Sequence, residues 1–278
     1  MTVNTDSGSC RRAGIVYVAT KLDRYVEEAF LSADSAKERC PALPITLFTD
    51  RLDHPLCATD RFDTVAPAPD VTGISLAWPE GKLRRLLGLR NTPYEYTLHL
   101  DADTRVVTYQ LMPLFDLLDE FDVAMVETAI DDSACRAQYG RRMFNAGFIL
   151  YKRNKLVWEW LAEWAAIAER NFRWADKDPL PRVASLRHVP SERVRRNLLT
   201  MDQTSLVEIL SPEINKFGLK LKILDSSWIY RGSMLSENNR EKPRIVHVER
   251  EDPMLRQSDL QSALKKIELR KYGQGVAS

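Results

Sequence analysis

The stretch Thr97-Leu-His-Leu-Asp101-Ala-Asp103-Thr104 joins a short apolar run to two acids, and the run Tyr96–Leu100 predicts a buried β-strand. Because alternate residues of a strand share a face, Asp101 and Asp103 are expected to point the same way where the strand ends. Their carboxylate oxygens are hard ligands that suit Mg²⁺ or Mn²⁺. The alternative is a turn whose acids cap backbone groups, since Asp is common in turns. We predict a divalent-metal site, because the acids follow an apolar strand in an alternating chain.

Outward from this strand, short apolar runs alternate with helical stripes. The expected strands are residues 14–20, 45–48, 62–65, 96–100, 123–126 and 146–151. The expected helices between them are residues 22–38, 82–89 and 111–118. This alternation predicts an α/β fold with a mixed, mostly parallel sheet flanked by helices. Ligands collect at the carboxyl ends of strands in such sheets, so Thr20, Asp50 and Asp101 are expected to meet in one crevice.

The second half of the chain begins with a long helix that Asn154 is expected to cap, with its tryptophans packed in the core. Residues 170–200 hold eight Lys or Arg, three acids and three prolines, which predicts a basic loop or mobile flap inserted in the domain. A helix over 201–210, strands over 221–224 and 244–248, and a last helix capped by Ser258 and Gln261 are expected to follow.

The expected organisation is a polar lead-in over residues 1–12, one domain over 13–250 and a helical extension over 251–278. The chain has 278 residues and is 44% hydrophobic, which is too apolar for a disordered protein. Its 40 basic and 39 acidic residues give a net charge of +1, without the basic excess of a dedicated nucleic-acid binder. Nucleic acid is therefore not an expected partner.

The cysteines and the hydropathy indicate the compartment. Cys10, Cys40, Cys57 and Cys135 are widely spaced and form no Cys-x-x-Cys pair, which favours reduced, structural thiols. No run of 18 apolar residues is present, so we expect no transmembrane span and a cytoplasmic protein.

Leu98-His-Leu-Asp-Ala-Asp-Thr104 resembles the Asp-x-Asp motif of the GT-A-fold glycosyltransferases, whose sheet is Rossmann-like. Three further elements agree in kind and order. The segments Ile15–Thr20 and Pro44–Asp50 resemble the two opening strands that hold the nucleotide. Phe144-Asn-Ala-Gly-Phe-Ile-Leu150 resembles a stretch of the glycogenin-like and related retaining families, and Met201-Asp-Gln203 resembles their Asp-Gln element. Together the four elements are more specific than any one of them, and they span residues 13–250.

The resemblance implies which residues hold the donor and the metal. The implied nucleotide-binding residues are Ala19, Thr20, Asp50, Asp101 and Ala102. The implied ligands of Mn²⁺ or Mg²⁺ are Asp101, Asp103 and His247. His247 follows an apolar run, where a half-buried, hydrogen-bonded histidine is the alternative interpretation.

The chain departs from the family after this histidine. It reads His247-Val-Glu-Arg-Glu-Asp where the family often continues His-x-x-Gly-x-x-Lys-Pro-Trp, so the glycine and lysine that embrace the diphosphate are absent. Lys82 and Arg85, on a short basic helix before the acid pair, are the cations expected to replace them. A solvated helix face is the alternative interpretation for Lys82.

Asn145 and Gly147 are candidate contacts of the sugar. A glycine lets the backbone approach a sugar closely, and the asparagine amide offers both a hydrogen-bond donor and an acceptor. A turn before a strand is the alternative. The resemblance makes Asp202 and Gln203 sugar-side residues, although Asp202 at a helix start is also a typical N-cap. In the family's retaining reaction the leaving diphosphate accepts the acceptor's proton, and Asp202 or Gln203 stabilises the oxocarbenium-like state. Glu127, after the strand 123–126, is a weaker candidate for acceptor contact.

We therefore expect a metal-dependent, retaining glycosyltransferase. The resemblance favours a UDP-sugar as the nucleotide-diphosphate sugar donor, and the hydroxyl acceptor is a glycan, a protein or a small molecule. The 170–200 segment, as a flap, would close over the diphosphate or steer an anionic acceptor.

Three alternatives stay open. A haloacid-dehalogenase-type phosphatase also carries Asp-x-Asp-x-Thr, with Asp101 as nucleophile and Asp103 as acid, although its motif normally closes the first strand. A nucleotidyltransferase would need a glycine-rich loop after the first strand, and residues 19–24 contain no glycine. A non-catalytic protein would use the basic 170–200 segment to bind RNA or another anionic partner.

Overall fold

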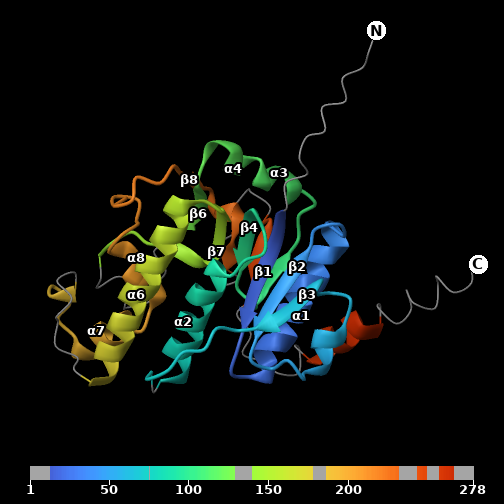
Figure 1. Ribbon diagram of the computed structural model, residues 1–278, viewed down its shortest axis with the longest axis horizontal. Helices are drawn as coiled ribbons and strands as arrows, with labels where there is room; N and C mark the ends of the chain where they lie inside the picture. The colour runs from blue at the N-terminus through green and yellow to red at the C-terminus, as the bar shows by residue number, and fades with distance from the viewer. Residues whose placement is uncertain are drawn as a thin grey trace, which may run out of the picture.

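A seven-stranded sheet in the order β3-β2-β1-β4-β7-β6-β8 forms the centre of the protein in a computed structural model (Figure 1). The residues that the structure describes are 13–74, 76–128, 140–177, 186–231, 243–248 and 257–265. The strands are β1 (Ala13–Ala19), β2 (Ile45–Thr49), β3 (Thr64–Pro67), β4 (Tyr96–Leu100), β6 (Val123–Glu127), β7 (Phe144–Lys152) and β8 (Leu221–Leu224). Only β7 is antiparallel to its neighbours in this sheet. The predicted mixed, mostly parallel α/β sheet is confirmed.

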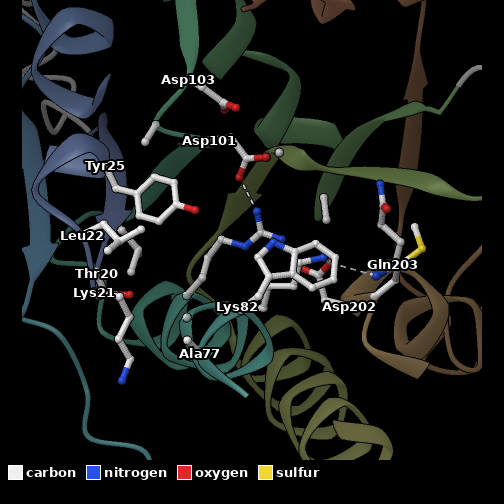
Figure 2. Close-up of a pocket in the computed structure, with 18 of the residues that line it drawn as sticks. Thr20, Lys21, Leu22, Tyr25, Ala77, Lys82, Asp101, Asp103, Asp202 and Gln203 are labelled. Carbon is white, nitrogen blue, oxygen red and sulfur yellow. Dashed lines mark hydrogen bonds and ion pairs between the residues drawn. The ribbon is translucent and has the colours of Figure 1, made fainter. Parts of the chain in front are cut away.

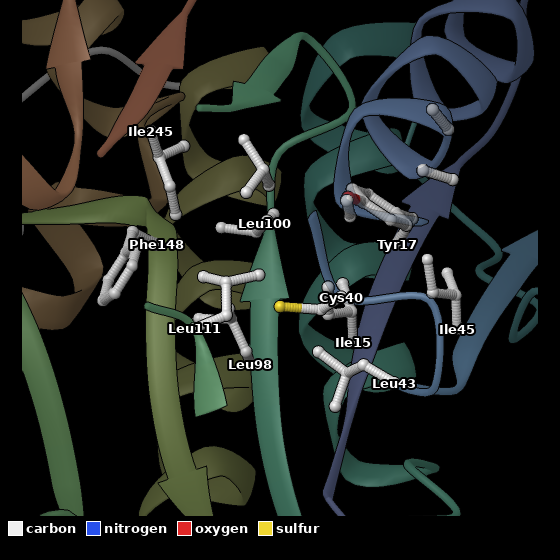
Figure 3. Packing of buried hydrophobic residues seen from close by; sticks show 14 of the residues in the cluster. Ile15, Tyr17, Cys40, Leu43, Ile45, Leu98, Leu100, Leu111, Phe148 and Ile245 are labelled. Carbon is white, nitrogen blue, oxygen red and sulfur yellow. The ribbon is translucent and has the colours of Figure 1, made fainter. Parts of the chain in front are cut away.

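Three long helices cover the two faces of the sheet. Helix α1 (Asp23–Arg39) packs on one face, and α2 (Ala77–Arg90) and α6 (Lys155–Lys177) lie side by side on the other (Figure 1). Because both faces are covered, the central strands β2 and β4 are buried along their whole length, including polar residues such as Thr97 and His99. Figure 3 shows Ile15, Leu98 and Phe148 in the core on the α1 side. On the opposite side the stacked rings of Trp160 and Trp164, 5.6 Å apart, confirm that these tryptophans pack in the core.

A second, three-stranded sheet holds the late histidine beside the acid pair. It consists of β5 (Thr104–Val106), β10 (Ile245–His247) and β9 (Tyr230–Arg231), with β10 in the middle. β10 runs antiparallel to β5, and His247 lies opposite Thr104. The amide of Val248 donates a hydrogen bond of 2.7 Å to the carbonyl of Asp103. This pairing brings the end of a distant strand to the Asp101-Ala-Asp103 turn.

Helix bounds differ from the expectations at α2, at residues 111–118 and at α8 (Asp202–Val207), which ends three residues before the expected residue 210. Helix α2 begins at Ala77, five residues before the expected start, because Pro79 is compatible with a first helical turn. The helix expected over 111–118 is divided into α3 (Met112–Phe115) and α4 (Leu117–Glu120). The remaining short helices are η1 (Pro55–Ala58), α7 (Glu192–Leu199) and η3 (Ser226–Trp228).

The prediction of a loop over 170–200 is wrong for most of its described residues. Helix α6 continues to Lys177, and α7 occupies Glu192–Leu199, where Ser191 caps it by accepting from the amide of Val194. Residues 178–185 of this segment lie outside the described residues. The apolar side of α6 continues through the buried Phe172, and this burial decides the structure in spite of the basic composition.

The ends of the chain are described only in part. Residues 1–12 lie outside the described residues, and in 251–278 the described residues 257–265 are helical, with Ser258 inside the helix and Leu260 buried. Cys40 and Cys57 are free thiols, whereas Cys10 and Cys135 lie outside the described part. Of the helices that the structure describes, none has the length and apolar character needed to cross a bilayer.

Candidate functional site

One cavity of about 670 Å³ opens at the carboxyl edge of the central strands (Figure 2). Its walls come from the β1–α1 connection, the start of α2, the end of β4, the start of β7, the start of α8 and the end of β10. The predicted site residues that line it are Thr20, Lys82, Arg85, Asp101, Ala102, Asp103, Asn145, Gly147, Asp202, Gln203 and His247. A cavity of this size is typical of small-ligand sites.

Asp101, Asp103 and His247 lie close enough to bind one ion. One ligand atom from each lies within 4.8 Å of the others. His247 Nε2 is 3.2 Å from Asp103 Oδ1 and 3.8 Å from Asp101 Oδ2. Two carboxylates suit Mg²⁺ or Mn²⁺, and the imidazole nitrogen is a softer ligand that favours Mn²⁺ of the two. The three residues form a candidate metal centre.

The two acids also control the charge on His247. Burial alone would lower the pKa of its imidazole, but hydrogen bonding and attraction by Asp101 and Asp103 raise that pKa to about 10. The ring is therefore protonated at neutral pH and supplies a positive charge between the carboxylates. The buried Nδ1 has no hydrogen-bond partner among the described residues. A divalent cation at this centre would replace the proton on the ring.

Arg85 connects the candidate metal centre to the other end of the cavity. Its guanidinium is ion-paired with Asp101 and with Asp202 at the same time. Lys82 adds a second pair, with its Nζ 3.2 Å from Asp202 Oδ1. Burial would raise the pKa of Asp202, and the attraction by Arg85 and Lys82 holds that pKa below its ordinary value. Asp202 is therefore a buried anion at neutral pH.

The backbone of Asp202 is fixed by the long helix behind it. Trp164 Nε1 donates a hydrogen bond of 2.9 Å to the carbonyl of Asp202, which is the first residue of α8. Asp202 Oδ1 also accepts from the amide of Gln203 at 3.1 Å. The alternative interpretation of Asp202 as an N-cap is wrong, because Met201 occupies the N-cap position and the Asp202 side chain also bonds to Arg85 and Lys82.

Gly147 and Asn145, at the start of β7, shape the wall next to Asp101. A Cβ on Gly147 would overlap the carboxylate of Asp101, so only glycine leaves room for that side chain. The amide of Asp101 donates to the carbonyl of Gly147 at 2.9 Å. Asn145 Oδ1 accepts from the amide of Gly147 at 2.8 Å. Position 147 therefore requires glycine, because the carboxylate of Asp101 occupies the space of a side chain there.

The connection after β1 forms a second wall. Lys21 has a φ of 77°, which is uncommon for a residue with a side chain. Asp50 stabilises this conformation by accepting from the amide of Lys21 at 2.9 Å, and an Arg51 nitrogen donates to the carbonyl of Lys21 at 2.7 Å. Asp50 and Ala19, both predicted at the nucleotide, are not among the residues that line the cavity.

Sequence reasoning did not identify several residues at the site. Leu22 and Tyr25 belong to the predicted helical stripe, yet both line the cavity, and Leu22 is exposed. Trp78 and Met201 also line it. The available signal for Trp78 was its position four residues before Lys82, which places the two side chains on one face of a helix.

His99 lies on β4 two residues before Asp101, so its side chain is on the same face of the strand. Its Nδ1 is 3.1 Å from the carbonyl of Val16, and its Nε2 is 3.7 Å from Asp101 Oδ1. Burial lowers the pKa of His99, so the ring is neutral. Spacing by two from Asp101 was the signal that could have identified it.

Neither Glu127 nor the described part of the 170–200 segment lines this cavity. No residue of 170–200 is among the described residues that line it. Instead, ion pairs join Arg170 to Glu208 and Arg196 to Glu192. Glu127 is ion-paired with Arg142 and does not line the cavity either.

Comparison of the sequence with protein-family models and with curated proteins gives no match. Solved structures do match. The galactosyltransferase LgtC, in a complex with donor and acceptor sugar analogs, is similar with a TM-score of 0.57 and 15% identity, over 90% of this chain and 95% of that one. The glycosyltransferase GlyE of Streptococcus pneumoniae is similar with a TM-score of 0.52 and 15% identity, over 95% of this chain and 65% of that one. The chain has the GT-A glycosyltransferase fold.

Proposed function

We propose that the protein is a metal-dependent, retaining glycosyltransferase whose donor is a nucleotide-diphosphate sugar, with UDP as the nucleotide. One observation carries the proposal: the group Asp101, Asp103 and His247 is joined through Arg85 to the buried anion Asp202 within one cavity of a GT-A fold. A site suited to a cation and a diphosphate thus lies beside a carboxylate suited to positive charge on a sugar.

The diphosphate would bind between the candidate metal centre and α2. Mn²⁺ or Mg²⁺ held by Asp101, Asp103 and His247 would neutralise the diphosphate and make it a better leaving group. Lys82 and Arg85 extend the positive charge along the cavity. A bound diphosphate would compete with the Asp101 and Asp202 carboxylates for these two cations. Lys82 and Arg85 would thereby take the place of the lysine that is missing after His247.

Asp202 would act on the sugar. Because Asp202 is ionised, it would stabilise the positive charge that develops on the ring as the bond between the anomeric carbon and the diphosphate oxygen breaks. Gln203 and Asn145 offer amide groups to the sugar hydroxyls. The acceptor oxygen would form its new bond on the same face of the sugar, and its proton would pass to the departing diphosphate oxygen.

The β1–α1 connection would bind the nucleoside. Thr20, Leu22 and Tyr25 line this part of the cavity, and Lys21 shapes it through its unusual backbone conformation. Asp50 would then act as a positioning residue that holds Lys21, rather than as a direct contact of the base or ribose.

Two of the three alternative functions, the phosphatase and the binding protein, have less support. A phosphatase would need Asp101 as a nucleophile at the end of the first strand, whereas Asp101 follows β4 and is paired with Arg85. A binding protein that used residues 170–200 would need an available basic surface, whereas Arg170 and Arg196 are paired with acids. The GT-A fold favours the transferase over both.

The test is a screen of nucleotide sugars for metal-dependent hydrolysis by the full chain, followed by NMR of the released sugar. We expect hydrolysis of a UDP-sugar with Mn²⁺, retention of the anomeric configuration, and loss of activity in Asp103→Ala. An inverted product would exclude the retaining mechanism. Release of phosphate from simple monoesters, lost in Asp101→Asn, would support the phosphatase instead.

A further inference from the structure

Trp78 is the exposed tryptophan of this chain. All six tryptophans lie within the described residues, and the other five are buried or partly buried, whereas Trp78 is 54% exposed. Its side chain nevertheless lines the cavity described above. An apolar ring that is exposed inside a binding cavity is a typical ligand contact, because a ligand that covers it removes apolar surface from water.

The position of Trp78 is fixed before any ligand binds. It is the second residue of α2 and precedes the buried Pro79. The amide of Glu80 donates to the carbonyl of Leu76 at 3.1 Å and closes the first turn around it. Because a helix holds the residue in place, binding would not require ordering of a loop.

Trp78 belongs to the Asp202 end of the cavity. The Nζ of Lys82 lies 3.6 Å from the centre of the Trp78 ring and 3.2 Å from Asp202 Oδ1, so one ammonium group touches both side chains. Figure 2 shows Thr20 on one side of the cavity and Gln203 on the other, with Asp101 between them. A nucleobase at Thr20 and a sugar at Asp202 would therefore lie on different sides of the cavity.

We propose that Trp78 is the binding platform for the acceptor, and that the acceptor is a pyranoside. This inference rests on the proposed function, which assigns the Asp202 end to the transferred sugar. A pyranose ring has an apolar face of C–H groups and a rim of hydroxyls. The apolar face would pack on the indole, and one hydroxyl of the rim would face the transferred sugar beside Asp202. A serine or threonine hydroxyl of a protein has no comparable apolar face.

The experiment compares full-length wild-type protein with Trp78→Ala, Trp78→Phe and the control Tyr109→Ala. Tyr109 is 72% exposed and does not line the cavity, so it controls for loss of an exposed aromatic ring. Binding of methyl glycosides of glucose, galactose and N-acetylglucosamine, and of lactose, is measured by saturation-transfer NMR with and without UDP and Mg²⁺. The Kd of UDP with Mg²⁺ is measured by calorimetry for each variant.

We expect at least one of these sugars to bind the wild type and Tyr109→Ala with equal affinity. Trp78→Ala should weaken that sugar about tenfold or more, which is the effect of removing a central aromatic contact, and Trp78→Phe should recover most of it. The Kd of UDP should change less than twofold in all variants. The proposal is overturned if no sugar binds the wild type or if Trp78→Ala binds the sugar normally. It is also overturned if Trp78→Ala weakens the binding of UDP as much as the binding of the sugar. Failure of UDP to bind the wild type contradicts the proposed function separately, because the sugars are also measured without UDP.

Discussion

The carboxylate of Asp101 occupies the space in which a side chain on Gly147 would lie. The two residues come from the antiparallel neighbours β4 and β7, and the amide of Asp101 also donates to the carbonyl of Gly147 at 2.9 Å. The orientation of the first acid in the candidate metal centre is therefore set by a glycine more than forty residues later in the chain.

Gly147→Ala should displace the Asp101 carboxylate and weaken Mn²⁺ binding about tenfold or more, because changes to the groups that orient a metal ligand typically have that effect. Overpacking should also reduce the free energy of unfolding by about 1–3 kcal/mol. Paramagnetic resonance of free Mn²⁺ in a titration gives the affinity, and thermal unfolding reports the stability.

Gly81→Ala is the matched control for this substitution. A Cβ on Gly81 would meet Thr20 Oγ1 at 3.5 Å, an ordinary contact, and alanine favours the helix by about 0.5–1 kcal/mol. We expect this variant to be at least as stable as the wild type and to bind Mn²⁺ normally. Equal Mn²⁺ affinities in the two alanine variants would contradict the role given to Gly147.

Arg85→Ala should destabilise the protein through the buried Asp202, whose side chain is 2% exposed. Breaking a buried pair by removing one partner costs about 3–5 kcal/mol at pH 7, because a charge is left with poorer compensation. Because the pKa of Asp202 is lower in the folded than in the unfolded chain, its ionised form stabilises the fold at a pH above the unfolded pKa. This stabilisation is lost as the pH falls through the folded pKa. The stability difference from the wild type should therefore narrow below about pH 4 in denaturant titrations.

The double variant Arg85→Ala, Asp202→Asn tests this cause. Because it removes the buried charge at position 202 together with the arginine that compensates it, the double variant should be more stable at pH 7 than Arg85→Ala alone. If the two substitutions destabilise additively, the loss does not arise from the Arg85–Asp202 pair.

Mn²⁺ affinity should rise with pH between about 6.5 and 9. The imidazole of His247 has a pKa raised to about 10, so an arriving cation must displace its proton throughout this range. The slope should approach a tenfold gain in affinity per pH unit, measured by Mn²⁺ titration at constant ionic strength. His247→Gln should bind Mn²⁺ more weakly and with a flatter dependence on pH.

Protonation of His247 should also affect the unfolding free energy of the metal-free protein, which is measured in the presence of a chelator. Because the pKa of His247 is raised to about 10 on folding, its protonated ring stabilises the folded chain, and the full contribution is present below the unfolded pKa of about 6.5. This contribution is lost as the pH rises through about 10. The part of the unfolding free energy that depends on His247 should fall over this range. An affinity and a stability that are both independent of pH would exclude a protonated His247 between the acids.

The sequence predicted the elements that depend on local pattern. The strand over Tyr96–Leu100 has the predicted bounds, and Thr20 and Asp101 meet at one edge because parallel strands end together. Periodicity also predicted that Trp160 and Trp164 pack in the core. Each of these expectations needed only the alternation of apolar residues within a segment.

The remaining features depend on contacts between distant segments. The approach of His247 to Asp103 requires the pairing of β10 with β5, which no local pattern specifies, and only the resemblance suggested it. The simultaneous pairing of Arg85 with Asp101 and Asp202 is also a tertiary contact. The 170–177 segment is helical because the buried Phe172 continues the apolar side of α6, a packing effect that its charge pattern concealed.

The most direct test of the central claim is calorimetric titration of UDP into the full chain with Mn²⁺, repeated in EDTA. The variants are Asp103→Asn and the control Asp116→Asn, which changes an exposed acid that does not line the cavity. We predict Mn²⁺-dependent UDP binding in the wild type and in Asp116→Asn, and its loss in Asp103→Asn and in EDTA. UDP binding that is equally strong in EDTA and in Asp103→Asn, or no binding by the wild type, would contradict a metal-dependent nucleotide-sugar site at Asp101, Asp103 and His247.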